Sequence, residues 1–368
     1  MKIQGTLRLA ALSLILTCPS AWAEFQRGYV SIVGSSTVVP FADVVAKRVA
    51  KSGKVHAPLV QGLGTGGALK LFCENLGPES PDIALASREM KPREREECKK
   101  NGVDVTELQI GYDGLILAQS RKAEPWFLSG KEVRLAFAKW IASGDKMDLN
   151  PNKLWKDVNP KLPAAPIEVL GPPKTSSTHD AFIDLISELE CKHEPWVPQG
   201  AAEPNPDLIR KCRSLREDNV YREGRENDLD QVAQISTSQG SPLGIVGFKI
   251  YTENADKIRA IPIDGVVPTF ESISNNAYIG TRPLYLYLKN AHINQTPGFR
   301  EFLSEFMNER AWGDKGYLRN EGLVIMPSTE RSANARKLEA FGVYPSTTAA
   351  TADPAPKKES KAKTKGKK

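Results

Sequence analysis

Residues 29–49 read YVSIVGSSTVVPFADVVAKRV, and this stretch contains one complete unit of the expected fold. The apolar run 29–33 is typical of a buried strand. Four small residues, GSST at 34–37, follow it, and apolar side chains then recur at helical spacing from Phe41 to Val49. A strand, a short polar loop and a helix in this order indicate an α/β layer architecture.

The same unit occurs twice more along the chain. The apolar run 55–61 leads into GLGTGG at 62–67, and the run 167–170 leads into GPPKTSST at 171–178. A helical pattern follows each of these loops. Strands that alternate with helices in this way predict further α/β layers.

Length and two further strands indicate more than one domain. Roughly 320 residues lie between the two terminal segments described below, which is large for a single core. The apolar runs 110–119 and 282–289 are strong strand candidates, and we expect them near the crossings between two lobes.

All three loops place small or hydroxyl-bearing residues where a helix begins. The first turn of a helix presents unpaired N–H groups and the positive end of the helix dipole, so an anion bound there receives several hydrogen bonds. Each loop alone is also compatible with an ordinary helix cap. Three such helix starts converging on one point would form an oxyanion site. The candidate ligands in these loops are Ser36, Thr37, Thr65, Gly66, Ser176, Ser177 and Thr178.

Three further residues are candidates for anion recognition. Ser87 and Arg88 end an apolar run, and a guanidinium there could bind an oxyanion through two hydrogen bonds. The alternative for Arg88 is an ion pair with Glu89 or Glu94. Asp113 could accept the proton that phosphate still carries near neutral pH and that sulfate lacks, and its alternative is an ordinary turn aspartate before glycine.

The two ends of the chain carry signals of their own. Residues 1–23 combine a basic start, a short apolar run and AWA at 21–23, which predicts a cleaved signal peptide and a periplasmic protein. Lipid attachment at Cys18 is the less favoured alternative. Residues 345–368 read as a disordered Pro/Ala/Thr linker and a Lys-rich tail.

Net charge is concentrated in these ends. Residues 357–368 contain seven lysines and one glutamate, or +6, and residues 1–23 add +2. Subtracting both from the total of +6 leaves −2 for residues 24–356. We therefore do not expect the body of the protein to bind nucleic acid.

Four cysteines remain after removal of residues 1–23, and in an oxidising compartment an even number indicates disulfides. Four cysteines allow three pairings, and we favour the two local ones, Cys73–Cys98 and Cys191–Cys212. Zinc is the alternative, but no C-x2-C spacing occurs and the four histidines are scattered. We expect neither a metal nor another cofactor.

Eight segments, in order along the chain, resemble the periplasmic phosphate-binding proteins that serve phosphate ABC importers. They are VGSSTV (33–38), GTGG (64–67), ASR (86–88), IGYDG (110–114), residues 171–182, GIVGF (244–248), TRPLYLY (281–287) and GYL (316–318). The resemblance implies a type II periplasmic-binding-protein fold, with two α/β lobes hinged around a central anion cleft. It also implies inorganic phosphate as the ligand, the permease subunits of an ABC transporter as partners, and a monomer.

The resemblance further implies how the chain is divided and which residues touch the anion. Lobe 1 would comprise residues 24–115 and most of a return segment, 271–344, and lobe 2 would comprise residues 116–270. The polar stretch 191–227 resembles an insertion, with a short helix around residues 207–215. The ligand residues implied are Ser36, Thr37, the backbone of Val38, Thr65, Gly66, Ser87, Arg88 and the loop Ser176 to Thr178.

The loop before the third helix departs from the family pattern. Members usually read TSGTRDAF there, whereas this chain reads TSSTHDAF at 175–182. Ser177 replaces a glycine that would let the backbone approach the ligand, and His179 replaces a permanent cation. We expect His179 to bind the anion more tightly as it becomes charged, which predicts higher affinity at pH 6 than at pH 8. The alternative is a pocket that has changed to another anion or to none.

Two other functions compete with phosphate capture. A hydrolase is disfavoured, because Ser176, His179 and Asp180 lie too close at one helix start for a Ser-His-Asp triad, and the sequence has no G-x-S-x-G pattern. The other is a binding-deficient envelope scaffold, held by its basic tail on an anionic surface. A solvated tail without function is the simpler alternative.

Overall fold

The fold is built around one curled nine-stranded sheet. The computed structural model describes residues 27–144, 146–174, 176–190, 206–224, 228–238 and 241–344. In spatial order the strands are β2 (Leu59–Gly62), β1 (Ser31–Gly34), β3 (Ile83–Ala86), β11 (Thr281–Lys289), β4 (Val105–Ser120), β9 (Leu243–Gly247), β7 (Val169–Gly171) and β8 (Tyr221–Glu223), with β10 (Ile258–Ala260) paired to β4.

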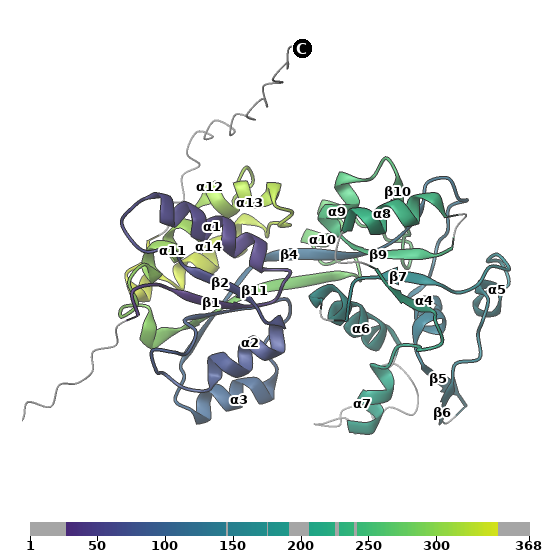
Figure 1. Cartoon of the computed structure of the whole chain (residues 1–368), viewed down its shortest axis with the longest axis horizontal. Helices are drawn as coiled ribbons and strands as arrows, with labels where there is room; N and C mark the ends of the chain where they lie inside the picture. The colour runs from purple at the N-terminus through teal and green to yellow at the C-terminus, as the bar shows by residue number, and fades with distance from the viewer. Residues whose placement is uncertain are drawn as a thin grey trace, which may run out of the picture.

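The sheet carries two separate bodies, which we call lobe 1 and lobe 2 (Figure 1). Lobe 1 packs on β1, β2 and β3 around Phe41, Phe302 and Trp312, and lobe 2 packs on β7 and β9 around Trp155 and Phe182. The long strands β4 and β11 run between them. This arrangement confirms the α/β fold with two lobes, whereas the exact segment boundaries stay a prediction.

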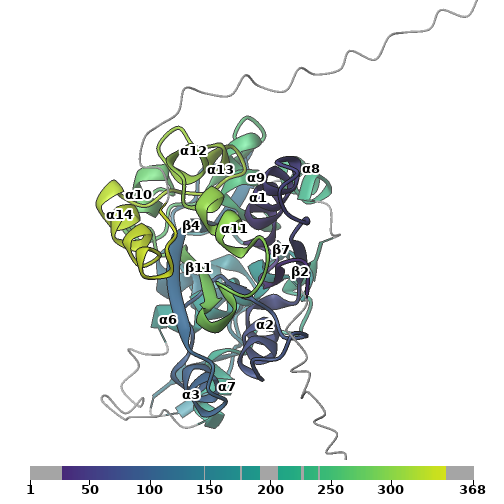
Figure 2. The ribbon, with the colours of Figure 1, turned by 90° about the vertical axis from the view of Figure 1, so that its left-hand side faces the viewer.

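Helices cover both faces of each lobe. Figure 2 looks onto lobe 1, where α11 lies in front of β11 and α2 and α3 lie below it. The lobe 1 helices are α1 (Val39–Lys51), α2 (Gly64–Cys73), α3 (Pro92–Lys100), α11 (Phe299–Phe306), α12 (Glu309–Trp312), α13 (Tyr317–Asn320) and α14 (Ser328–Arg336). Those of lobe 2 are α4 (Gly130–Phe137), α5 (Trp155–Val158), α6 (Ser177–Glu190), α7 (Pro206–Cys212), α8 (Asp228–Thr237), α9 (Phe248–Glu253) and α10 (Phe270–Ser274), with a hairpin of β5 (Trp140–Ser143) and β6 (Lys146–Leu149).

Two glycines fix where the hydroxyl-bearing loops leave the sheet. A Cβ on Gly34, at the end of β1, would lie 2.3 Å from the carbonyl oxygen of Leu85 on β3. A Cβ on Gly171, at the end of β7, would lie 2.2 Å from the Tyr221 hydroxyl. No side chain fits at such distances, so glycine lets each strand pack closely against its neighbour immediately before its loop.

Several expectations from the sequence are confirmed. The apolar runs 110–119 and 282–289 lie within β4 and β11, and α7 is the short helix expected in the polar stretch. Cys73 and Cys98 form a disulfide. Cys212 is buried and disulfide-bonded, but Cys191 lies outside the described residues, so that pairing stays a prediction. The expected signal peptide and the tail also lie outside them, and no helix within them is long and apolar enough to cross a bilayer.

Candidate functional site

Two of the predicted loops face one cavity from opposite lobes. The loop between β1 and α1 contributes Ser36 and Thr37, and the loop before α6 and the first turn of α6 contribute Ser176 and Thr178. The cavity has a volume of about 430 Å³. Hydroxyl groups from both lobes therefore line the same space, as the sequence predicted for an oxyanion site.

A second cavity, of about 360 Å³, shares the lining residue Arg282 with the first. Ser87 and Arg88 line it from lobe 1, and Asp184 and Arg213 line it from lobe 2, where they form an ion pair. Arg282 lines both cavities. We call the two cavities together the cleft.

A buried ion pair lines the cleft. It joins β4 and β11, the two long strands that connect the lobes. Arg282 on β11 lies directly opposite Asp113 on β4 in the antiparallel register. Its guanidinium donates to the Asp113 carboxylate from Nε at 3.0 Å and from Nη2 at 2.5 Å, and to Thr178 Oγ1 at 3.3 Å. Arg282 is only 6% exposed and Asp113 only 8%. The pair gives the cleft a permanent cation and a carboxylate acceptor at one point.

Sequence reasoning selected Asp113 but missed Arg282. The signal was present, because Arg282 is the one arginine in the apolar strand 281–289. A charge in such a run is rarely buried without a partner. What the sequence could not supply was the register that sets this arginine against Asp113, 169 residues away.

Not all predicted ligands face the cavities. Val38 is fully buried, and its backbone N–H donates to the Ser35 carbonyl at 2.9 Å. The Thr65 hydroxyl lies 3.3 Å from that of Ser87 and accepts the Ser87 backbone N–H at 3.2 Å. Thr65 on α2 thus supports the Ser87 loop, and contact of Thr65 or Gly66 with an anion stays a prediction.

Arg88 is engaged with a carboxylate on its own lobe. Its guanidinium donates to both oxygens of Glu94, at 2.8 Å and 2.7 Å, and to the Glu89 carbonyl at 2.9 Å. Burial lowers the pKa of Arg88, but the hydrogen bond and charge of Glu94 outweigh this and raise the pKa overall. The predicted alternative, an ion pair with Glu94, is therefore present, and it leaves Arg88 at the wall of the cleft.

His179 occupies a different environment from the one its motif suggested. It is 7% exposed, and its ring packs edge-on against Tyr221 with 5.2 Å between centroids. His179 does not line either cavity. Burial lowers its pKa, although the charge of Asp180 acts in the opposite direction, so the neutral form is favoured. The side chain of Ser177 lies outside what the structure describes, and a ligand role for either residue stays a prediction.

The chain is similar in sequence to a known protein family and to individual relatives. A family model described as a PBP superfamily domain matches residues 20–310. Protein SphX of Synechococcus elongatus is 26% identical, over 91% of this chain and 90% of its own. The phosphate-binding protein PstS of Staphylococcus saprophyticus is also 26% identical, over 92% and 94%.

Solved structures show the same fold. A structure described as a possible phosphate binding protein from Planctomyces limnophilus superposes with a TM-score of 0.63 at 25% identity, covering 85% of this chain and 98% of that one. An ABC-type phosphate transport receptor from Vibrio cholerae gives a TM-score of 0.58 at 16% identity, covering 81% and 100%.

Proposed function

Because this chain belongs to the PBP superfamily domain family, we propose that it captures inorganic phosphate outside the cytoplasmic membrane and delivers it to an ABC importer. Curated relatives that span nine-tenths of the chain include a protein named for phosphate binding. The observation that carries the proposal is the Arg282–Asp113 pair, placed where hydroxyls from both lobes meet.

The chemistry of this pair suits phosphate better than other common oxyanions. Near neutral pH phosphate carries both negative oxygens and a remaining proton. Arg282 would donate to the oxygens, and Asp113 would accept the proton. Sulfate has no proton to donate, so the carboxylate would repel it. Ser36, Thr37, Ser176 and Thr178 would supply the remaining hydrogen bonds.

Binding would close the cleft. The main cavity is much larger than a five-atom oxyanion fills, and β4 and β11 connect the lobes (Figure 1). A ligand that contacts hydroxyls of both lobes only in the closed form shifts the equilibrium toward that form. The closed monomer would then present both lobes to the permease subunits.

Binding rather than catalysis is proposed for the loop residues. Ser176 and His179 are near neighbours in sequence, but the His179 ring packs against Tyr221 rather than lining the cavity with Ser176. A nucleophile needs its base within hydrogen-bond reach. A phosphomonoester assay that detects no release of phosphate would support this assignment, and turnover would contradict it.

The alternatives are a receptor for another oxyanion and an envelope scaffold held by the basic tail. Isothermal titration calorimetry of residues 24–356, unfolded and refolded to remove bound ligand, separates them. Micromolar or tighter binding of phosphate with no heat from sulfate is the expected result. Heat from sulfate alone would indicate a different anion receptor, and no heat from either would indicate a scaffold.

The substitution Asp113→Asn tests the basis of selectivity in the same assay. It keeps the size of the side chain but removes the charge that excludes sulfate. We expect the preference for phosphate over sulfate to fall by about tenfold or more, which corresponds to the loss of one charge-assisted hydrogen bond of about 1.4 kcal/mol. Serine in place of Thr37 is a matched control, because it keeps a hydroxyl and should leave the preference unchanged. An unaltered preference in D113N would contradict the role of Asp113.

A further inference from the structure

The second cavity of the cleft has an arginine–carboxylate pair on each of its two walls. Arg88 and Glu94 form the pair on lobe 1, and Asp184 and Arg213 form the pair on lobe 2. Asp184 belongs to α6, which lies on the side of lobe 2 that faces α2 of lobe 1 (Figure 1). Arg88, Asp184 and Arg213 all line the same cavity. An arginine and a carboxylate from opposite lobes therefore face one space.

Both pairs are in contact with solvent. The side chains of Arg213 and Asp184 are 35% and 33% exposed, and those of Arg88 and Glu94 are also partly exposed. Ion pairs of this kind contribute little to stability, because water competes with each partner. Either pair can therefore gain or exchange a partner at small cost.

The charge of Asp184 already acts on Arg88 across the cleft. Burial lowers the pKa of Arg88, whereas the hydrogen bond and charge of Glu94 and the charge of Asp184 raise it. The hydrogen bonds of Arg88 to Glu94 and to the Glu89 carbonyl use three of the five N–H groups of its guanidinium. A carboxylate from lobe 2 can therefore bind Arg88 without displacing Glu94.

We propose that Asp184 forms an ion pair with Arg88 when the lobes close, and that this pair stabilises the closed form without touching phosphate. The inference rests on the proposed function, because closure on phosphate is what brings the two walls together. An interaction that exists only in the closed form shifts the equilibrium toward that form. Asp184 is thus a positioning residue, which raises the apparent affinity for phosphate and slows its release.

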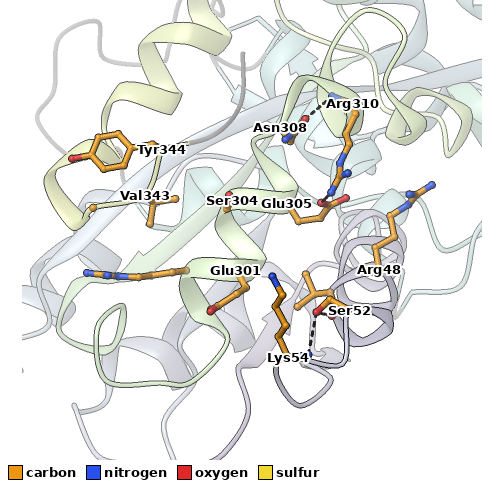
Figure 3. Close-up of a pocket in the computed structure, with 13 residues that line it drawn as sticks. Arg48, Ser52, Lys54, Glu301, Ser304, Glu305, Asn308, Arg310, Val343 and Tyr344 are labelled. Carbon is orange, nitrogen blue, oxygen red and sulfur yellow. Dashed lines mark hydrogen bonds and ion pairs between the residues drawn. The ribbon is translucent and has the colours of Figure 1, made fainter. Parts of the chain in front are cut away.

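The cavity shown in Figure 3 provides a contrast, because it lies within lobe 1. It has a volume of about 400 Å³ and is lined by residues at the end of α1, on α11 and near them. Glu301 lines this cavity and is exposed, and Glu305 there pairs with Arg310 of the same lobe. Hinge closure moves each lobe as a body, so it leaves these partners unchanged.

Calorimetry of Asp184→Asn with phosphate tests the proposal by the sign of the effect. A carboxylate on the wall of an anion site repels the ligand, so its removal should by itself raise the affinity for phosphate. If Asp184 stabilises the closed form, its removal lowers the affinity instead. We expect a loss of about threefold to fivefold, as for a partly solvated ion pair, and recovery to within about twofold in Asp184→Glu.

The loss should appear in the release of phosphate rather than in its capture. The ion pair forms after phosphate has bound, so its removal should increase the dissociation rate by about the same threefold to fivefold. Repulsion of the approaching anion would change the association rate instead. Exchange of bound radiolabelled phosphate for unlabelled phosphate measures the dissociation rate directly.

Two carboxylates that line neither cavity of the cleft serve as controls. Glu168 of lobe 2 pairs with Arg222, and its side chain is 35% exposed, close to the value for Asp184. Glu168→Gln and Glu301→Gln each remove one negative charge and should change the affinity for phosphate by less than about twofold. Urea unfolding shows whether each variant is folded.

A double variant identifies the partner of Asp184. When Arg88→Gln is already present, Asp184→Asn should no longer weaken phosphate binding, because the cross-lobe pair has lost its cation. Only the repulsion between the carboxylate and the anion then remains to be removed.

Three outcomes would overturn the inference while leaving phosphate capture intact. Unchanged or higher affinity in D184N would show that the pair does not form. A loss that persists in the presence of Arg88→Gln would show that Asp184 acts through Arg213. Equal losses in D184N and E168Q would show that only net charge matters. No heat from phosphate with the unaltered protein would instead refute the proposed function, and this inference with it.

Discussion

Two of the arginine–carboxylate pairs at the cleft differ in almost every physical respect. Arg282 and Asp113 join two central strands, and both are more than nine-tenths buried. Arg88 and Glu94 lie six residues apart on lobe 1, with side chains 24% and 21% exposed. The first pair joins residues that are far apart in the sequence and are brought together by strand pairing. The second is a local contact at the start of α3.

This difference in burial indicates which of the two pairs recognises the ligand. Loss of the partner of a buried charge costs much stability, so the Arg282–Asp113 pair is held in one geometry before any ligand arrives. The pair on lobe 1 is partly solvated and can exchange Glu94 for another anion at small cost. We therefore infer that the Arg282–Asp113 pair selects the ligand and that Arg88 adds a secondary contact.

The largest effect is expected for Arg282→Gln. This change leaves the Asp113 carboxylate buried without its cation and removes the central donor of the cleft. Phosphate affinity should fall at least 100-fold in calorimetry, and the free energy of unfolding in urea should fall by about 3 kcal/mol. Arg88→Gln is the matched control, with an expected loss of affinity below tenfold. Equal losses in the two variants would remove the distinction between the pairs.

An intermediate effect is expected for Glu94→Gln. Burial raises the pKa of Glu94, but hydrogen bonds from Arg88 and the Lys91 backbone outweigh this and lower the pKa below its ordinary value of 4.5. The carboxylate therefore stabilises the fold above about pH 4.5, and this contribution is lost as the pH falls through the lowered pKa. We expect E94Q to reduce the free energy of unfolding by about 1 kcal/mol at pH 7.

The pH dependence of E94Q checks its physical cause. The difference in unfolding free energy between E94Q and the unaltered protein should shrink when both are measured near pH 3 by urea titration. Phosphate affinity at pH 7 should change less than tenfold. A difference that stays constant with pH would show that the pair contributes packing rather than charge.

The sequence predicted the loops of the candidate site and Asp113, but not Arg282, the arginine that pairs with Asp113. The loops with Ser36, Thr37, Ser176 and Thr178 were found because strand, glycine and hydroxyl residues are neighbours in the chain. The Cys73–Cys98 bridge followed from local spacing in the same way. Arg282 was missed because its role depends on strand register.

His179 shows that a residue next to a ligand motif in the sequence can face away from the cavity in the structure. The motif places it beside the ligand loop, but on α6 its side chain packs against Tyr221 and does not line the cavity. Whether a helical residue faces a ligand or the core depends on the rotation of the helix after its first turn. Adjacency in a motif does not supply that rotation.

The smallest effect on binding is expected for His179→Gln. Because burial lowers the pKa of His179, the neutral imidazole is favoured, and any affinity gained by charging it moves to more acidic pH. Calorimetry of H179Q should therefore match the unaltered protein within about threefold between pH 6 and 8. A gain in affinity at pH 6 that H179Q abolishes would instead place a charged His179 at the ligand.

We expect His179 to affect the pH dependence of the free energy of unfolding, although it has little effect on phosphate binding. A histidine with a lowered pKa in the folded state binds its proton more readily when the chain is unfolded. It therefore destabilises the fold as the pH falls below its unfolded value of about 6.5. Replacing it with glutamine removes this loss, so the free energy of unfolding in urea should fall less between pH 7 and pH 5 in H179Q. An unchanged pH dependence would show that His179 gains a compensating partner when it is protonated, and Asp180 is the nearest carboxylate in sequence that could serve.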